Sequence, residues 1–258
     1  MRYTDNPPKV DERRVYLGCA GWNIRREHTE CFEPSGTHLQ RYASTFNAVE
    51  INSCFYRPHR LATYERWAAS VPDFFSFAVK LPKAITHEAR FVDTSELVDK
   101  FLAEVSGLGK KLGPILVQLP PSFQFDAAVA IPFLSDLRAR FGGNIVIEPR
   151  HETWFTRDVS DQLETLRIAR VAADPARVPE AAIPGGFPDI VYYRLHGSPR
   201  IYYSAYSSEY LAQIAASLVE YASAGKVVWC IFDNTALGAA TADALTVQTA
   251  IGTVETKN

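Results

Sequence analysis

Eight short apolar runs alternate along this sequence with stretches whose apolar residues recur at helical spacing. Strands that alternate with helices are typical of parallel βα units, and right-handed crossovers place successive strands side by side. Eight such units in about 250 residues predict an α/β fold, the TIM-type (β/α)8 barrel. The predicted strands cover residues 15–20, 48–51, 74–80, 114–119, 144–148, 169–174, 190–197 and 226–234, and the predicted helices cover 38–46, 61–70, 95–109, 126–141, 157–167, 207–223 and 238–250.

One unit departs from this pattern. Between the sixth and seventh predicted strands, the sequence PARVPEAAIPGGFPD is rich in proline and glycine and has no helical periodicity. We predict that a loop replaces the helix there. An open doubly wound sheet is the alternative fold, and it would put the site at a switch point of the strand order. No repeat or linker divides the chain, so we expect a single domain over residues 15–258 after an N-terminal tail, 1–14.

The composition limits the classes of function. With 47% hydrophobic residues the chain can bury a large core, and its net charge of −2 gives no overall attraction to nucleic acid or to anionic membranes. The first 14 residues lack the apolar stretch of a secretory signal, and no apolar run is long enough to span a membrane, so no membrane partner is expected. The four cysteines form no C-x-x-C pair, which favours reduced thiols and a cytoplasmic protein.

The barrel hypothesis predicts where a site would lie. Sites of TIM-type barrels lie at the C-terminal ends of the strands, and polar or aromatic residues stand at the end of every predicted strand. These residues are Trp22, Glu50, Asn52, Lys80, Gln118, Glu148, Arg150, His151, Asp174, Arg194, His196, Asp233 and Asn234. The sequence therefore predicts a ring of charge around one mouth of the barrel.

Seven motifs in order resemble those of the Domain of Unknown Function 72 family, the YecE-like proteins. They are GCAGW (18–22), VEINSCFYR (49–57), FAVKLPKAITH (77–87), KLGPILVQLPPSF (111–123), EPRHETWF (148–155), YYRLHG (192–197) and FDNT (232–235). The resemblance runs from about residue 15 to about residue 250 and implies a TIM-type barrel. It implies no particular reaction, because the family has no established activity.

The acids at the strand ends allow two interpretations. Glu50, Glu148 and Asp233 are candidates for general acids, bases or metal ligands, because a buried carboxylate without a partner is costly. The alternative is an ion-pair network with the neighbouring cations that closes the mouth of the barrel. Glu148 is our preferred proton-transfer group, because His151 follows it closely and is a second catalytic candidate.

The cations favour an anionic ligand. Lys80, Arg150 and Arg194 come from three strands and would converge on one mouth, where arginine grips phosphate or carboxylate with two hydrogen bonds. Charge balance against the acids is the alternative. The sequence has neither a P-loop nor a Rossmann fingerprint, so no nicotinamide or flavin cofactor is expected.

A divalent metal is a further alternative. Glu148, His151, His196 and Asp233 would be its ligands, although the sequence has no H-x-H or H-E-x-x-H pair. Histidines that bind a proton or orient a neighbour are the commoner use. A Ser-His-Asp triad is not favoured, because no G-x-S-x-G elbow is present.

Aromatic residues near the strand ends suit stacking on a sugar or a base. Trp22 and Tyr206 are the candidates for this role. The full set of predicted substrate-binding residues is Trp22, Asn52, Lys80, Gln118, Arg150, Asp174, Arg194, His196, Tyr206 and Asn234.

Together these features predict an enzyme that acts on a phosphate-bearing sugar, a nucleotide or a nucleic-acid end, by acid/base or metal-assisted hydrolysis or isomerisation. Two alternatives stay open: a glycosidase with Glu50 and Glu148 as paired carboxylates, and a non-catalytic protein that binds nucleotides or nucleic acid. The direction of the acids discriminates between them. Free carboxylates facing the pocket favour catalysis, whereas carboxylates tied to arginine or lysine favour a scaffold or a binding site.

Overall fold

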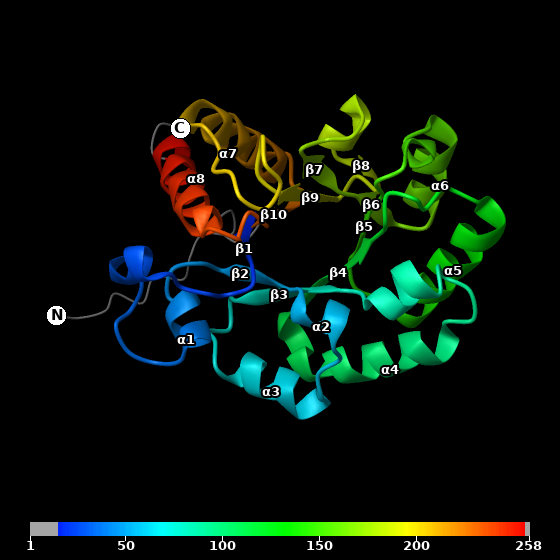
Figure 1. Ribbon diagram of the computed structural model, residues 1–258, viewed down its shortest axis with the longest axis horizontal. Helices are drawn as coiled ribbons and strands as arrows, with labels where there is room; N and C mark the ends of the chain where they lie inside the picture. The colour runs from blue at the N-terminus through cyan, green and yellow to red at the C-terminus, as the bar shows by residue number, and fades with distance from the viewer. Residues whose placement is uncertain (1–14, 256–258) are drawn as a thin grey trace.

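A computed structural model describes residues 15–255, and the tail predicted for residues 1–14 lies outside the described residues. The strands stand side by side inside a surround of helices (Figure 1), and all neighbours in the main ring are parallel. The strands are β1 (Val15–Ala20), β2 (Ala48–Ile51), β3 (Ser76–Lys80), β4 (Leu112–Gln118), β5 (Ile145–Glu148), β6 (Ile168–Arg170), β7 (Ala172–Asp174), β8 (Gly185–Gly186), β9 (Ile190–Leu195) and β10 (Val227–Phe232).

The sixth predicted strand closes the ring. It is divided at Val171 into β6, which pairs with β5, and β7, which pairs with β9. The backbone N–H of Val171 donates to the carbonyl of Ile147 at 2.8 Å, so the chain stays against β5 across the break. Because this one strand joins both ends of the strand order, the predicted TIM-type barrel is confirmed and the open doubly wound sheet is wrong.

The predicted helices are confirmed, with shifted ends. The helix predicted over 95–109 ends earlier because the chain continues as a 3-10 helix, Ser106–Lys111, where Gly109 has a non-helical backbone. A four-residue helix after β2 was not predicted; it is α2 in the following list. The helices are α1 (His38–Tyr42), α2 (Ser53–Tyr56), α3 (Leu61–Ala69), α4 (Ser95–Val105), α5 (Ala127–Arg140), α6 (Arg157–Thr165), α7 (Ser208–Ser223) and α8 (Ala239–Glu255).

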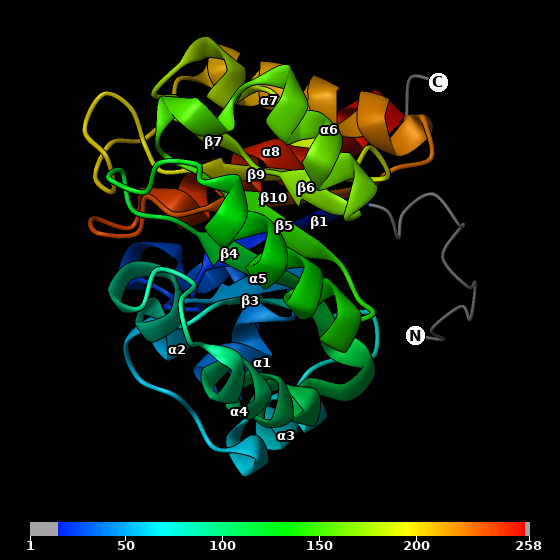
Figure 2. The same ribbon diagram turned by 90° about the vertical axis from the view of Figure 1, so that its right-hand side faces the viewer.

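In the described chain no α-helix lies between β7 and β9, as the proline- and glycine-rich sequence of this connection predicts. The segment instead forms a single 3-10 turn, Pro179–Ala182, and the two-residue strand β8, which pairs antiparallel with β6. The turned view shows helices α5, α6 and α7 on the outside of the strands near this segment (Figure 2).

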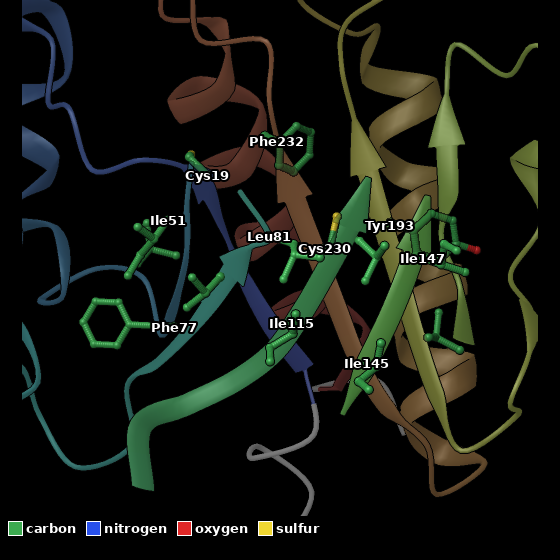
Figure 3. Packing of buried hydrophobic residues seen from close by; sticks show 14 of the residues in the cluster. Cys19, Ile51, Phe77, Leu81, Ile115, Ile145, Ile147, Tyr193, Cys230 and Phe232 are labelled. Atoms are coloured by element: carbon green, nitrogen blue, oxygen red, sulfur yellow. The ribbon is translucent and has the colours of Figure 1, made fainter. Parts of the chain in front are cut away.

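Side-chain alternation along the strands divides the apolar residues into two cores. On β10, Val228, Cys230 and Phe232 belong to the outer core, which also contains residues of the helices, whereas Trp229 and Ile231 belong to the inner core. Figure 3 shows part of the outer core. The inner core contains strand residues and Val171, which lies at the break between β6 and β7, and it fills the barrel: Ala48, Ala78, Leu116, Val146, Ala169, Val171, Ile190, Tyr192, Trp229 and Ile231.

Three stacked rings form the floor beneath the site. Trp229 stacks on Tyr16 with ring centroids 4.5 Å apart and lies parallel to Tyr192 at 5.9 Å. Glycine is required at position 113, because a Cβ atom there would lie 2.7 Å from the Trp229 ring. The large rings therefore leave no channel along this part of the barrel axis, and a ligand can enter only from an end.

None of the described helices combines the length and the apolar character that crossing a bilayer requires. The four cysteines are free thiols, and Cys19, Cys54 and Cys230 are buried. Burial raises the pKa of the Cys19 and Cys54 thiols to about 12, so neither thiol is a reactive thiolate at neutral pH.

Candidate functional site

The alternation that builds the inner core places the charged residues directly above it. The next inward position after Ala48 is Glu50, the next after Ala78 is Lys80, and the next after Tyr192 is Arg194. The same step of two residues gives the remaining members of this layer, Gln118, Glu148 and Asp233. The polar layer is thus the top of the barrel interior, at the C-terminal ends of the strands.

Arg194 is the centre of this layer and is 1% exposed. Its Nε and Nη2 atoms donate to the two oxygens of Glu50 at 3.0 and 2.6 Å. Its Nη1 atom donates to Glu148 at 2.5 Å, and Nη2 also donates to Asp233 at 2.9 Å. Three carboxylates from β2, β5 and the end of β10 therefore converge on one guanidinium, and they raise the pKa of Arg194 although burial opposes the charge.

Tyr192 connects this network to the aromatic floor. Its hydroxyl donates to Glu50 at 2.8 Å, while its ring lies parallel to Trp229. Both oxygens of Glu50 therefore accept hydrogen bonds from buried donors. Glu50 is itself 0% exposed, so its charge is balanced entirely by groups inside the barrel.

His196 bridges two of the carboxylates. Its Nδ1 lies 3.0 Å from Asp233 and its Nε2 lies 2.9 Å from Glu148. Burial alone would lower the pKa of His196, but the charge of Glu148 and the hydrogen bonds to both acids raise it above its ordinary value. When protonated, the imidazole can donate through both nitrogens, and both lie within hydrogen-bond distance of a carboxylate.

Arg150 lies at the edge of the network. Its Nη2 and Nε atoms donate to the same oxygen of Glu148, at 2.9 and 3.2 Å. Burial would raise the pKa of Glu148, but the charges of Arg194, Arg150 and His196 hold it well below the usual range. Glu148 is thus an ionised carboxylate with both oxygens occupied, whereas the Arg150 side chain is 18% exposed and reaches the surface.

Two groups at the mouth have unused hydrogen-bonding capacity. Within residues 15–255 the Nζ of Lys80 makes no hydrogen bond or ion pair, and it lies 4.0 Å from the ring centroid of Phe55. Oδ2 of Asp233 accepts from Arg194 and His196, but Oδ1 has no partner in the same part of the chain, and this side chain is 13% exposed. An open cation and an open carboxylate oxygen therefore face the entrance.

Lys80 and the neutral ring of His87 form one side of the mouth, and Lys80 carries its positive charge. Burial lowers the pKa of Lys80 to about 8, helped by the charge of Arg194. Burial and the charges of Lys80 and Arg150 lower the pKa of His87 to about 4. The His87 ring packs edge-on against Phe55 at 4.9 Å. This side of the mouth consequently repels a further cation and attracts an anion.

Two cavities flank the network. The first has a volume of 130 Å³ and is lined by Arg150, Arg177 and His196, with Glu148 and Pro175 beside them.

The second cavity, of 330 Å³, is lined by Trp22, His38, Glu50 and Asn52. The Oδ1 atom of Asn52 is buried there without a hydrogen-bond partner. Trp22 packs edge-on against Trp67 at 5.0 Å, so its ring is fixed at the cavity wall. The predicted residues Trp22 and Asn52 thus line a hollow beside the network.

Three predicted substrate-binding residues form hydrogen bonds within the protein through their side chains, and a fourth, Asp174, accepts one through its backbone carbonyl. The Tyr206 hydroxyl donates to the carbonyl of Asp174 at 3.2 Å and accepts from the N–H of Gly197 at 2.8 Å. The amide of Asn234 donates to Asp243 at 2.7 Å. Gln118 donates to the carbonyl of Leu119. Tyr206, Asp174 and Asn234 fix the loop after β9 over the barrel.

The structure does not bring His151 into the network. Its Nδ1 atom accepts a hydrogen bond from the backbone N–H of Thr153 at 3.3 Å and lies 3.0 Å from the Thr153 hydroxyl, so it caps the 3-10 turn Glu152–Trp154. A local backbone turn follows β5 and carries this side chain away from the inward series that ends at Glu148. The pairing of His151 with Glu148, based on their proximity in sequence, is not observed.

The residues present do not fit the metal alternative. Within the described chain, no three His, Cys, Asp or Glu side chains are placed to hold a metal ion. Arg194 occupies the point at which Glu50, Glu148 and Asp233 converge, and a second cation there would be repelled. Of the four predicted ligands, only Glu148, His196 and Asp233 lie together, and they bind each other.

Sequence reasoning missed residues that the structure places at the site. Tyr192 was assigned no role there, because it looks like an ordinary apolar residue of a strand. Tyr192 lies two positions before Arg194, and this inward alternation was the available signal. Arg177 lies in the proline-rich segment, which has no periodicity to indicate where a side chain points.

Comparison with known proteins gives a family. The description "Protein of unknown function DUF72" applies to the family that matches residues 16–258. The UPF0759 protein YecE of Escherichia coli K12 is 31% identical over 149 residues, which cover 57% of this chain and 53% of that protein. The UPF0759 protein YunF of Bacillus subtilis 168 is 26% identical over 184 residues, covering 66% and 64%. The chain thus spans about half to two thirds of the length of these relatives.

Solved structures share the fold. A DUF72 family protein of Enterococcus faecalis V583 superposes with a TM-score of 0.78 at 22% identity, over 92% of this chain and 95% of that chain. One from Thermotoga maritima MSB8 has a TM-score of 0.76 at 24% identity, over 92% and 99%. At these identities the likeness establishes the barrel and leaves the chemistry to the site.

Proposed function

Because the chain belongs to the DUF72 family of proteins of unknown function, we propose its function from the site: an enzyme of acid/base chemistry on a small, phosphate-bearing, hydroxylated substrate. Sugar phosphates, nucleotides and phosphorylated nucleic-acid ends have this chemistry. The observation that carries the proposal is the pair of open groups at the mouth, the Nζ of Lys80 and the Oδ1 of Asp233, beside a cavity lined by two arginines.

The cavity beside Arg150 suits the phosphate. Arg150 and Arg177 line it together with His196, whose pKa the neighbouring acids raise, and its volume is 130 Å³. Arginine presents paired N–H donors that match two phosphate oxygens. Glu148, the carboxylate in the wall, already accepts from Arg194, Arg150 and His196, so its charge is compensated by these groups. The phosphate would thus meet Arg150, whose position is fixed by its hydrogen bonds to Glu148 before the phosphate binds.

The proton-transfer role goes to Asp233. Arg194, His196 and Lys80 lower the pKa of Asp233 although burial opposes this, so the carboxylate is ionised and accepts a proton or a hydroxyl hydrogen bond through Oδ1. Glu50 and Glu148, which were predicted as catalytic, act in this proposal as positioning residues that hold Arg194. Lys80 faces the reacting end of the substrate, where its charge stabilises negative charge that develops on oxygen.

Isomerisation is the reaction that we favour over hydrolysis. Moving a proton between neighbouring carbons needs one open carboxylate and one cation near the carbonyl oxygen, and the mouth offers one of each. Hydrolysis with acid/base catalysis also needs a group that delivers a proton to the leaving oxygen. Both nitrogens of His196 lie against carboxylates, Asp233 and Glu148, so neither is free to deliver that proton.

The test measures binding and chemistry separately. Isothermal titration calorimetry with inorganic phosphate should show binding that weakens by about tenfold or more in Arg150→Met and in Arg177→Met. The matched control is Arg157→Met, an arginine with 93% side-chain exposure on the far side of α6, which should bind phosphate like the wild type. Absence of phosphate binding at millimolar concentrations would contradict the proposal.

Chemistry is then followed without knowledge of the product. Sugar phosphates are incubated in deuterated water with wild-type protein, Asp233→Asn and Lys80→Met, and proton and phosphorus NMR report deuterium incorporation at carbon and phosphate release. Isomerisation predicts incorporation that both variants lose. Phosphate release without incorporation would make the enzyme a hydrolase.

A non-catalytic binding protein is the second candidate. It is favoured by the saturation of Glu50 and Glu148, because all four of their oxygens accept hydrogen bonds from protein donors. This candidate predicts phosphate binding with neither deuterium incorporation nor release in the NMR experiment. If nucleic acid is the ligand, affinity for a phosphorylated oligonucleotide falls steeply with salt.

The glycosidase alternative has less support. Arg194 holds Glu50 and Glu148 on the same guanidinium, and cationic neighbours keep the pKa of Glu148 well below its usual range. A glycosidase needs one carboxyl group with a raised pKa to protonate the leaving oxygen. At Glu148 the neighbouring cations outweigh the effect of burial, so its pKa is not raised.

The cytoplasmic location stays a prediction. Its support is that all four cysteines are free and that three of them are buried as thiols. Cell fractionation of the untagged protein tests it directly.

A further inference from the structure

The amine of Lys80 differs from the other buried cations of the network in having no acidic partner. Arg194 contacts three carboxylates, whereas Lys80 Nζ, in the described part of the chain, has only the face of Phe55 at 4.0 Å. A lysine that served only to balance charge would lie against one of those acids. The open amine is therefore available to a ligand.

The surroundings of Lys80 favour its neutral form. Burial and the charge of Arg194 lower its pKa to about 8, although Glu50, Glu148 and Asp233 act in the opposite direction. With that pKa about a tenth of the molecules carry a neutral amine at neutral pH, compared with less than about one in a thousand for an exposed lysine. Burial together with a neighbouring cation is the combination that activates nucleophilic lysines.

The backbone holds this amine in place. Lys80 is the last residue of β3, and its carbonyl accepts a hydrogen bond from the buried thiol of Cys54 at 3.1 Å. The following N–H, of Leu81, donates to the carbonyl of Leu116 on β4 at 2.9 Å. A side chain rooted in the barrel wall reaches the mouth from a fixed point, as a residue that forms a covalent intermediate requires.

We propose that Lys80 is a nucleophile that forms an imine with the aldehyde or ketone group of the substrate. The proposal rests on the proposed function, narrows its substrate class to phosphate-bearing carbonyl compounds, and replaces the electrostatic role given to Lys80 there by a covalent one. Lys80 stands at the open side of the layer, and Asp233 offers the oxygen that has no other partner.

The step balances without another reactant. The lone pair of the neutral Nζ forms a bond to the carbonyl carbon, and the carbonyl π electrons move to oxygen, which takes up a proton to give a carbinolamine. The carbon–oxygen bond then breaks, and the oxygen leaves as water with two protons that come from the nitrogen. We assign to Asp233 Oδ1 the transfer of one of these protons. The carbon becomes a C=N centre, next to which a proton is more easily removed.

Borohydride trapping tests this directly. Wild-type protein is incubated with D-glyceraldehyde 3-phosphate and sodium cyanoborohydride, and mass spectrometry of the digested protein locates the reduced adduct. We expect the adduct at Lys80 at least tenfold above its level at Lys83, an exposed lysine paired with Glu88 at 2.9 Å. Inorganic phosphate should compete with the reaction, and glyceraldehyde without the phosphate should react more slowly.

Two variants complete the experiment. Lys80→Arg keeps a cation but cannot form an imine, so the site-specific adduct should vanish while phosphate binding by calorimetry persists. Lys83→Arg should leave the adduct at Lys80 unchanged. A thermal melt by circular dichroism checks that each variant is folded, and peptide mapping of the wild type gives the answer even if a variant is not.

The outcomes separate the two proposals. Phosphate binding together with adducts spread evenly over exposed lysines would overturn the imine and leave the proposed function standing. No phosphate binding and no preference for Lys80 would overturn both. An adduct that persists at full yield in Lys80→Arg would show that another lysine reacts, and this also overturns the inference.

Discussion

Arg194 and Lys80 rise from the same inward layer of one barrel, yet they have opposite surroundings. Arg194 on β9 donates to three carboxylates, which raise its pKa, whereas Lys80 on β3 has no acidic partner among the described residues and burial lowers its pKa to about 8. Both are cations removed from water. The difference lies in which strand ends supply acids nearby.

The comparison shows that one side of the charged layer serves to stabilise the fold and the other side is suited to bind a ligand. On the Arg194 side, every charge is compensated by a neighbour, so this side stabilises a particular arrangement of strand ends. On the Lys80 side, a charge is held without a contacting acid among the described residues, which costs stability and makes sense where a ligand completes the site. Five predictions break or sharpen this comparison.

The largest effect is expected for Arg194→Met. It leaves Glu50, Glu148 and Asp233 buried around an apolar side chain, and breaking a buried ion pair by removing one partner costs about 3–5 kcal/mol. Urea denaturation measures the free energy of unfolding. The surface variant Arg157→Met should unfold like the wild type. A small loss in Arg194→Met would mean that the network is not structural.

A smaller and pH-dependent loss is expected for His196→Asn. The folded pKa of His196 is raised, so its stabilising contribution is complete below the unfolded pKa near 6.5 and is lost as the pH rises through the folded value. The variant should lose about 2 kcal/mol near pH 6 and less near pH 9. Denaturation curves of both proteins at the two pH values measure the difference.

NMR of labelled histidines sharpens the same point. His196 should titrate above its ordinary pKa, while His87, beside Lys80 and Arg150, should stay neutral down to about pH 4. If both rings titrated together near pH 6.5, the contrast between the two sides of the mouth would be wrong.

Lys80→Met should stabilise the protein, which is the opposite of Arg194→Met. Removing an uncompensated buried cation is expected to raise the free energy of unfolding by about 1–2 kcal/mol near pH 7. Because the folded pKa of about 8 lies below the unfolded value of 10.5, the wild type regains this stability as the pH rises from 8 to 10.5. The advantage of the variant should therefore fade near pH 10, and an advantage that persists there would point to better packing instead.

The smallest effect is expected for Tyr192→Phe. It removes one hydrogen bond to Glu50, which still accepts from Arg194 through both oxygens, and the ring keeps its place parallel to Trp229. We expect a loss of about 1 kcal/mol with phosphate binding unchanged. Weaker phosphate binding would show that the floor positions the Lys80 side as well.

Much of the fold follows from the sequence. The alternation of apolar runs with helical patterns predicts the barrel, and β1 and β2 occur at the predicted residues. The Pro- and Gly-rich segment correctly predicts a unit without an α-helix. The division of the sixth strand at Val171 was not predictable, because only closure of the ring makes one half pair with β5 and the other with β9.

The sequence predicts where the site lies but not which of its residues contact each other. The strand-end rule identified Glu50, Lys80, Glu148, Arg194, His196 and Asp233. It also gave His151 a catalytic role, because a neighbour in sequence looks like a neighbour in space; a capping hydrogen bond to Thr153 turns that ring away. Tyr206 and Asn234 hold the loop after β9, which the sequence did not indicate, and their contact with a ligand stays a prediction.

The sequence by itself determined which side chains face the interior, because the two-residue period of a strand is a local property. It thereby determined that acids and cations of one mouth would meet. Only the tertiary structure decided which residues form ion pairs. Glu50 and Arg194 are 144 residues apart in the sequence, and they pair because the barrel closes. Lys80 has no acidic partner among the described residues for the same reason. The energy of an ion pair depends on the distance between its charges, and a local sequence pattern does not determine that distance.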